Sequence, residues 1–130
     1  MNSKEKILVV DDDPDVRLFN STVVEENGYT PIEAENGEEG LKMIREKKPD
    51  LVILDVMMPE MTGLELCRTL KSDQRTSHVP VILLTALSET ESRHQGLHDG
   101  ADAYLAKPFD GQEPRLRVRN LIEQRRRLAQ

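Results

Sequence analysis

Several residues of this 130-residue sequence stand at the ends of short apolar runs and carry groups that could take part in chemistry. They are three consecutive aspartates, a single aspartate, a threonine and a lysine: Asp11, Asp12, Asp13, Asp55, Thr85 and Lys107. Carboxylates that lie close together repel one another and raise each other's pKa unless a cation lies between them. A lysine could supply one positive charge, and a hard divalent ion could supply two. Carboxylate, carbonyl and water ligands together suit Mg²⁺.

A magnesium site of this kind fits phosphoryl chemistry. The metal, a lysine and a hydroxyl donor can stabilise charge on phosphoryl oxygens while one carboxylate attacks phosphorus. Asp55 is the best candidate for the nucleophile, because it stands alone after a central apolar run. Asp11 and Asp12 would then hold the metal from the neighbouring strand. Asp13 precedes Pro14, so we expect it to cap a helix rather than to bind metal.

The elements that would position these residues are short strands alternating with helices. Five strands are predicted, at residues 7–10, 30–34, 51–54, 81–84 and 103–106. The first, third and fourth are nearly continuous Ile, Leu and Val, which is typical of parallel strands covered on both faces. Helix-start signals follow the strands, at Asp13, Asn36, Thr62, Ser88 and Asp110. The alternation predicts an α/β fold with a five-stranded, doubly wound parallel sheet, whose strand ends meet at one edge.

Composition narrows the class of protein further. The formal net charge is −6 and the pI is near 5.1, so direct nucleic-acid binding by this domain is not expected. A single cysteine, Cys67, excludes an internal disulfide and a cysteine-based zinc site. The sequence contains neither a signal sequence nor the ~18 consecutive apolar residues that a membrane span needs. We therefore expect a cytoplasmic protein without a membrane partner.

The C-terminal residues differ in charge from the rest of the chain. Residues 111–130 carry six arginines and two glutamates, a net charge of +4, which leaves −10 for residues 1–110. An apolar stripe also runs on through the last predicted helix to Leu128. We therefore divide the chain into a domain at residues 1–122 and a C-terminal helix extension at residues 123–130. The extension is interpreted as a connector to an output domain, with a dimerising segment as the alternative.

Four stretches of the sequence resemble the receiver domain of response regulators in bacterial two-component signalling. They are ILVVDDD at residues 7–13, LVILDVMMPEMTGLEL at 51–66, VPVILLTA at 79–86 and GADAYLAKPF at 100–109, in the family's order and spacing. The resemblance implies a flavodoxin-like (βα)5 fold with strand order 2-1-3-4-5. It also implies a phosphorylation-activated signalling switch, which is not an enzyme beyond catalysing its own phosphorylation and dephosphorylation.

The resemblance assigns the acceptor and the metal ligands. Asp55 would accept a phosphoryl group from the phosphohistidine of a sensor histidine kinase or a phosphotransfer protein. Asp12 and Asp55 would bind Mg²⁺ directly, together with the backbone carbonyl of Met57. Asp11 would act mainly through a metal-bound water.

The remaining roles concern the response to phosphorylation. Thr85 would hydrogen-bond the phosphoryl group, and Lys107 would pair with it, aimed by a cis peptide bond to Pro108. Tyr104 matches the family's switch aromatic, which moves inward as Thr85 shifts. The responding face would be the fourth helix, fifth strand and fifth helix. A fused or separate output domain and a phosphorylation-dependent homodimer are further expected partners.

Two other functions fit parts of the sequence. A phosphohydrolase of the haloacid dehalogenase type would use Asp11 and Asp13 as its DxD motif. It would lack a further acidic motif after Lys107 and would leave Asp55 unexplained. A pseudo-receiver would bind partners without being phosphorylated, but every residue that phosphorylation requires is present.

His94 and His98 have a spacing that can hold zinc, but no nearby residue completes a ligand set.

The lifetime of the phosphorylated state is a separate hypothesis. Met57 lies two residues after the acceptor, and Leu87 lies two residues after Thr85. In the family these positions flank the path of the attacking water. Because both side chains are apolar here, we predict slow autodephosphorylation.

Overall fold

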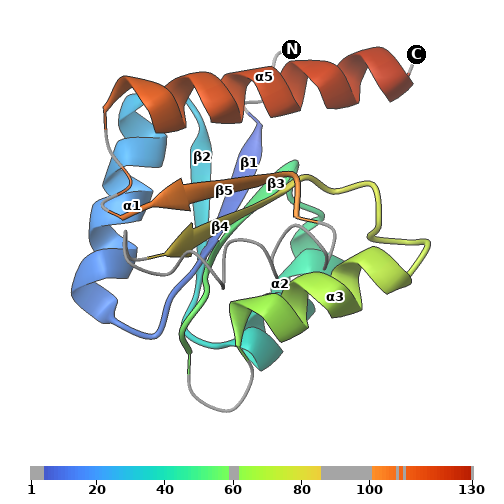
Figure 1. The fold of residues 1–130 in the computed structure, drawn as a ribbon, viewed down its shortest axis with the longest axis horizontal. Helices are drawn as coiled ribbons and strands as arrows, with labels where there is room; N and C mark the ends of the chain where they lie inside the picture. Colours follow the sequence, from blue (N-terminus) through green and yellow to red (C-terminus); the bar gives the residue numbers. More distant parts are fainter. Residues whose placement is uncertain (1–4, 59–61, 86–100, 108, 110, 130) are drawn as a thin grey trace.

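One five-stranded parallel sheet forms the centre of this computed structural model, which describes residues 5–58, 62–85, 101–107, 109 and 111–129 (Figure 1). The strand order is β2-β1-β3-β4-β5. The strands are β1 (Lys6–Val10), β2 (Thr30–Ala34), β3 (Leu51–Asp55), β4 (Val81–Thr85) and β5 (Ala103–Ala106). The predicted fold class and strand order are therefore confirmed, and β3 and β4 each include one polar residue more than the sequence predicted.

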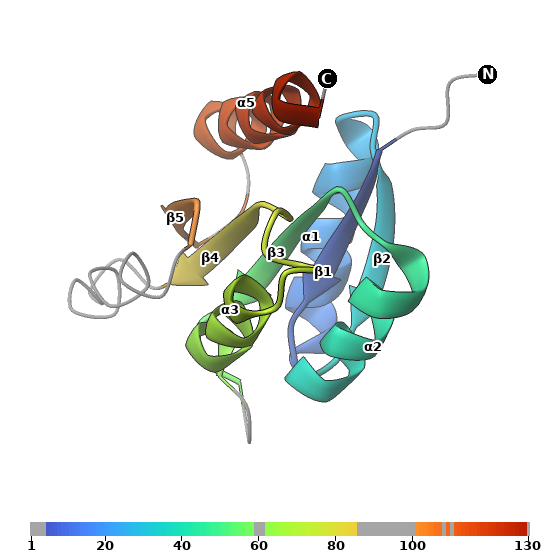
Figure 2. The same cartoon turned by 90° about the vertical axis from the view of Figure 1, so that its right-hand side faces the viewer.

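Helices cover both faces of the sheet. The described helices are α1 (Pro14–Glu26), α2 (Gly37–Lys47), α3 (Gly63–Ser72) and α5 (Gln112–Ala129). Figure 2 shows α1 and α5 on one side of the sheet and α2 and α3 on the other. The predicted segment at residues 88–100, with His94 and His98, lies outside the described residues. No helix in the described ranges is long and apolar enough to cross a membrane.

The core consists of two apolar layers, one on each face of the sheet. Alternate residues of the three central strands enter opposite layers, as the two-residue period of a strand requires. Leu8, Leu54 and Leu83 pack toward α2 and α3, whereas Ile53 and Ile82 pack toward α1 and α5. Because β3 and β4 are buried along their whole length, the residues at their ends have fixed positions at the edge of the sheet.

Capping residues set where the helices begin. The Asp13 carboxylate accepts hydrogen bonds from the backbone N–H groups of Asp15 and Val16, at 2.9 and 3.4 Å. Asn36 caps α2 in the same way. Thr62 and Glu65 form a reciprocal capping box at the start of α3. The predicted capping roles of Asp13, Asn36 and Thr62 are thus confirmed, while Asp110 lies outside the described residues.

Gly40 allows α2 to lie close to the sheet. Glycine inside a helix costs about 1 kcal/mol relative to alanine, so its place in α2 needs a reason. A Cβ at Gly40 would lie 3.2 Å from Cγ2 of Val10 and 3.4 Å from Cδ2 of Leu66. The distance to Val10 is tighter than ordinary van der Waals contact and the distance to Leu66 is at its short limit, so the small residue permits the close approach of α2 to β1 and α3.

Candidate functional site

The strand register brings the predicted site residues to one edge of the sheet. Val10 of β1 is level with Leu54 of β3, so Asp11 and Asp55 follow on neighbouring strands. Thr85 of β4 is level with Ala106 of β5, which places Lys107 immediately beyond it. The site therefore lies at the carboxyl ends of the strands. It includes the β1/β3 boundary, where the strand order reverses and where ligands bind in open α/β sheets.

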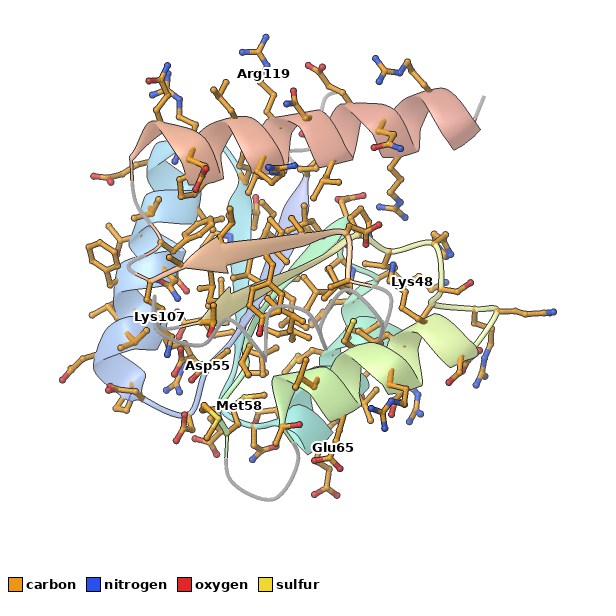
Figure 3. The ribbon with its side chains drawn as sticks, viewed as in Figure 1. Lys48, Asp55, Met58, Glu65, Lys107 and Arg119 are labelled. Carbon is orange, nitrogen blue, oxygen red and sulfur yellow. The ribbon has the colours of Figure 1, made fainter. Side chains whose placement is uncertain are left out.

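Asp55 is a buried carboxylate held by two donors. Its side chain is 5% exposed. The Lys107 ammonium lies 2.9 Å from Oδ1, and the backbone N–H of Met57 donates to the same oxygen at 3.2 Å. Figure 3 shows Asp55 and Lys107 beside each other at the end of the sheet toward which β4 and β5 point. Both of these contacts are to Oδ1, so Oδ2 is the oxygen considered below for a metal or an electrophile.

Burial sets the protonation behaviour of Asp55. Desolvation raises the pKa of its carboxyl group above the ordinary value, and the hydrogen bond and charge of Lys107 oppose that rise. The Met57 N–H lowers the pKa as well, whereas the charge of Asp12 raises it. A nucleophilic Asp55 must be ionised. The Lys107 ammonium favours that ionised form against the effect of burial.

Asp11 is also buried and has one oxygen without a partner. Oδ1 accepts a hydrogen bond from the Asp13 backbone N–H at 3.0 Å. Oδ2 is buried and has no hydrogen-bond partner in the described part of the chain. Desolvation raises the pKa of Asp11 to about 6, with the Asp13 hydrogen bond acting against it and the Asp55 charge adding to it. A buried carboxylate oxygen with an unfilled bonding site fits a cation nearby.

The three carboxylates fit a magnesium ion. Asp11, Asp12 and Asp55 each present an oxygen atom, and these atoms all lie within 4.8 Å of one another. Oxygens bound to one octahedral Mg²⁺ lie about 2.1 Å from the ion and therefore at most about 4.2 Å apart. Small side-chain rotations would bring the observed oxygens to that spacing. The exposed Asp12 side chain leaves room for the waters that Mg²⁺ usually keeps.

Thr85 and Lys107 are linked through the backbone. The backbone N–H of Lys107 donates to the carbonyl of Thr85 at 2.8 Å, which extends the β4–β5 ladder by one bond. Thr85 is 3% exposed, and Tyr104 is 8% exposed within the apolar layer under α2 and α3. Because Thr85 lies two residues after Leu83, which belongs to the same layer, Thr85 and Tyr104 share a face of the sheet. A cis peptide bond was predicted between Lys107 and Pro108, and Pro108 lies outside the described residues.

Two residues near the acceptor were not singled out by sequence reasoning. Arg17 donates to the backbone carbonyl of Asp11 at 2.8 Å and to Glu33 of β2 at 3.1 Å, so it fixes the backbone at the end of β1. Gly63 lies so close to the Asp55 backbone carbonyl that a Cβ there would overlap it. The Gly63 N–H also donates to the Val56 carbonyl at 3.0 Å, which anchors α3 beside the acceptor.

Asp13 does not join the carboxylate cluster. Its side chain is exposed and caps α1, and the group of oxygens within 4.8 Å contains Asp11, Asp12 and Asp55 instead. The DxD arrangement of a haloacid dehalogenase would need Asp13 at the metal. The geometry therefore favours the site centred on Asp55.

Strand order and an acidic site at the β1/β3 switch point together define a flavodoxin-like domain of the receiver type. The chain belongs to the response regulator receiver domain family, which it matches over residues 7–119. A receiver domain protein from Clostridium thermocellum superposes on it with a TM-score of 0.88 at 30% sequence identity, covering 95% of this chain and 98% of that chain.

Curated relatives extend the comparison to longer proteins. Histidine kinase P4 of Formosa agariphila is 46% identical over 125 residues, which are 96% of this chain and 9% of that protein. The DNA-binding transcriptional regulator RpaA of Synechocystis sp. is 40% identical over 125 residues, which are 96% of this chain and 52% of the regulator. The chain thus spans about half the length of the regulator and a small part of the kinase.

Proposed function

We propose that the chain is a phosphorylation-activated signalling switch in which Asp55 accepts a phosphoryl group. The observation that carries this proposal is the position of the Asp55 carboxylate: 2.9 Å from the Lys107 ammonium and within 4.8 Å of carboxylate oxygens of Asp11 and Asp12. Membership of the receiver family supports it. The proposed donor is a phosphohistidine of a sensor histidine kinase or of a phosphotransfer protein.

The proposed reaction is a displacement at phosphorus. Oδ2 of Asp55 forms a bond to phosphorus while the phosphorus–nitrogen bond to the donor histidine breaks, and the released imidazole nitrogen keeps the electron pair. Lys107 turns from the carboxylate toward the phosphoryl oxygens, and the Thr85 hydroxyl donates a hydrogen bond to one of them. Mg²⁺ bound by Asp12, Asp55 and the Met57 carbonyl, with Asp11 acting through a bound water, would offset negative charge on the phosphoryl group.

The response to phosphorylation would pass from Thr85 to Tyr104. Both residues lie on the same face of adjacent strands, and both side chains are buried. A shift of Thr85 toward the phosphoryl group would change the space available to the Tyr104 ring. We propose that the change is read on the surface formed by β5, α5 and the segment predicted as the fourth helix.

Output and assembly depend on what lies beyond the receiver domain. RpaA, which has a similar receiver sequence, is a DNA-binding regulator. We propose that residues 1–122 form the receiver domain and that residues 123–130 connect it to an output domain, fused or separate. A phosphorylation-dependent homodimer is a further proposed state. We also propose that the chain acts in the cytoplasm, where its one cysteine, the buried Cys67, would stay reduced.

Stoichiometry with a small phosphodonor tests the proposal. The chain is incubated with acetyl phosphate and Mg²⁺, and both bound phosphoryl groups and released phosphate are measured. A switch takes up one phosphoryl group per chain and releases phosphate slowly. A hydrolase that uses Asp11 would release many equivalents of phosphate per chain, and that result would overturn the proposal.

A further inference from the structure

A cavity lined by several basic residues lies at the end of the sheet opposite Asp55. It has a volume of about 480 Å³ and lies between the C-terminal end of α2, the loop that follows α3, and α5. Figure 3 shows Lys48, which lines this cavity, far from the labelled pair Asp55 and Lys107. The volume falls within the range of small-molecule sites. The receiver chemistry described above uses none of its residues.

The cavity is positively charged although the chain is acidic. Arg45, Lys48, Arg75 and Arg125 line it, against a single lining carboxylate, Asp73. The whole chain, by contrast, has a formal net charge of −6. Asp73 and Asp50 offset the charges of Arg75 and Arg125, but the remaining positive charge would attract an anion into this concave space.

Two of the cations are already paired and two are not. Arg75 makes a two-pronged contact with Asp73, at 3.2 and 2.9 Å, and Arg125 lies 2.8 Å from Oδ1 of Asp50. Within the described ranges, the side chains of Arg45 and Lys48 make no ion pair or hydrogen bond. An anion that binds these two cations would break neither ion pair, although the charge of Arg45 already helps to lower the pKa of Asp73.

The backbone at Lys48 supports a built site. Lys48 has φ 48°, and it is the one described non-glycine residue with a positive φ. This left-handed conformation at a helix end is commonly taken by glycine, and it is strained for a lysine. The lysine side chain places a positive charge at the cavity, where glycine would leave none.

The floor of the cavity is apolar. Ile44 and Val79 are 2% and 4% exposed, and Pro49 beside them is also buried. A ligand that carries only charge would leave this floor in contact with water. An apolar or aromatic body would cover it, and arginine guanidinium groups can also stack on aromatic rings.

Arg125 ties the cavity to the C-terminal helix. It lies on α5 beyond residue 119, where the match to the receiver family ends. Its partner Asp50 also accepts a hydrogen bond from the Lys6 backbone N–H at 2.8 Å, so α5 is held to the start of β1 and β3. One wall of the cavity is thus formed by a segment that the family match does not include.

We propose that this cavity is a binding site for a small organic anion, in which a phosphate or carboxylate group is attached to an apolar or aromatic body. The anionic group binds between Arg45 and Lys48, and the body covers Ile44 and Val79. Because Arg125 forms part of the wall, the ligand also stabilises the C-terminal half of α5 against the sheet.

Phenyl phosphate, inorganic phosphate and phenol test the two parts of this recognition. Each is titrated into the ¹⁵N-labelled chain in buffer freed of metal on a chelating resin, so that the metal-dependent site is not engaged and no chelator anion competes. Phenyl phosphate is expected to give saturable shifts at the backbone N–H groups of Lys48, Thr76 and Val79. Phosphate alone and phenol alone are expected to bind at least about tenfold more weakly, because each lacks one part of the ligand.

Variants separate specific binding from general charge attraction. A variant with both Arg45→Gln and Lys48→Gly is expected to weaken phenyl phosphate binding at least about tenfold, because it removes two charge-assisted contacts. Glycine at position 48 suits the positive φ, so the fold is retained. Arg117→Gln removes one exposed charge of α5 outside the cavity and should leave binding unchanged.

Three results would overturn the proposal. They are the absence of saturable shifts at the cavity with phenyl phosphate, equal binding of inorganic phosphate, and undiminished binding by the double variant. None of them bears on phosphorylation of Asp55, which is measured separately and with Mg²⁺ present.

Discussion

The Lys107 ammonium lies 2.9 Å from Oδ1 of Asp55, at the carboxyl ends of β5 and β3. Strand β4 separates these two strands in the sheet, so the long lysine side chain reaches across it. Loss of this cation would leave Asp55 with the hydrogen bond from the Met57 N–H. The contact lowers the pKa of this 5% exposed carboxyl group and so favours its ionised form.

Removing the ammonium is expected to raise the pKa of Asp55. In a Lys107→Gln variant the hydrogen bond to a cation and its charge are both lost, and these are the two largest influences that lower this pKa. The change is measured by ¹³C NMR titration of the aspartate carboxyl groups in metal-free buffer. Lys42→Gln, an exposed lysine on α2, serves as the control. An Asp55 pKa that is the same in all three proteins would contradict the role given to Lys107.

Asp11→Asn is expected to stabilise the metal-free protein at neutral pH. Folding raises the pKa of Asp11 from 3.8 to about 6, so the folded state binds a proton more tightly than the unfolded state. Stability from this group is therefore fully present below pH 3.8 and is lost as the pH rises to about 6. At about 1.4 kcal/mol for each pKa unit, the loss reaches about 3 kcal/mol as an upper limit.

Urea unfolding of the two proteins in EDTA measures this difference. The variant should exceed the parent in free energy of unfolding by about 1–3 kcal/mol at pH 7, and the difference should shrink as the pH falls toward 4. Asp12→Asn is the matched control, because the exposed Asp12 side chain keeps its hydration. A parent protein that is more stable than Asp11→Asn at pH 7 would show that burial does not penalise this carboxylate.

Two glycine substitutions should differ sharply in their effect on stability. Gly63→Ala places a Cβ onto the Asp55 backbone carbonyl, which neither backbone can avoid without moving, so we expect a loss of about 2 kcal/mol or more. Gly40→Ala meets side-chain atoms of Val10 and Leu66 at 3.2 and 3.4 Å, and alanine favours the helix by about 1 kcal/mol. The net change there should be within about 1 kcal/mol of zero. Thermal and urea unfolding measure the stability of both variants. Equal losses of stability in Gly63→Ala and Gly40→Ala would contradict the distinction between backbone overlap and side-chain contact.

Met57 should control the lifetime of the phosphorylated state. Its side chain is 63% exposed beside the acceptor, and an apolar group there does not orient water. Met57→Asn is therefore expected to speed the loss of the phosphoryl group, which is followed by intact mass after the phosphodonor is removed. Leu18→Asn, at an exposed position of α1, is the control for surface polarity. An unchanged rate in Met57→Asn would remove the hypothesis of apolar shielding.

Local patterns were sufficient to predict most of the sheet. The bounds of β2 and β5 agree with those predicted from sequence, and β1, β3 and β4 are each longer by one residue. Asp55 and Thr85 belong to their strands because the ladder continues past the apolar run, as in the Val56 N–H bond to the Leu84 carbonyl at 3.0 Å. Apolar periodicity alone cannot detect such a bond.

Contacts between distant segments could not be read from the sequence. Arg17 binds the Asp11 carbonyl, Gly63 packs on the Asp55 carbonyl, and Arg125 reaches Asp50 at 2.8 Å. Each depends on tertiary packing rather than on a local pattern. The capping box of Thr62 and Glu65 is different, because its Thr-x-x-Glu spacing is a local signature and was available from sequence.

Mapping the phosphorylated residue tests the central claim most directly. The chain is phosphorylated with acetyl phosphate and Mg²⁺, the acyl phosphate is reduced with borohydride, and the altered residue is located by peptide mass spectrometry. The parent protein and Asp13→Asn should both be modified at position 55, because Asp13 serves as a helix cap. Asp55→Asn should take up no phosphoryl group, with or without Mg²⁺. Modification at Asp11 or Asp13, or full phosphorylation of Asp55→Asn, would contradict the account.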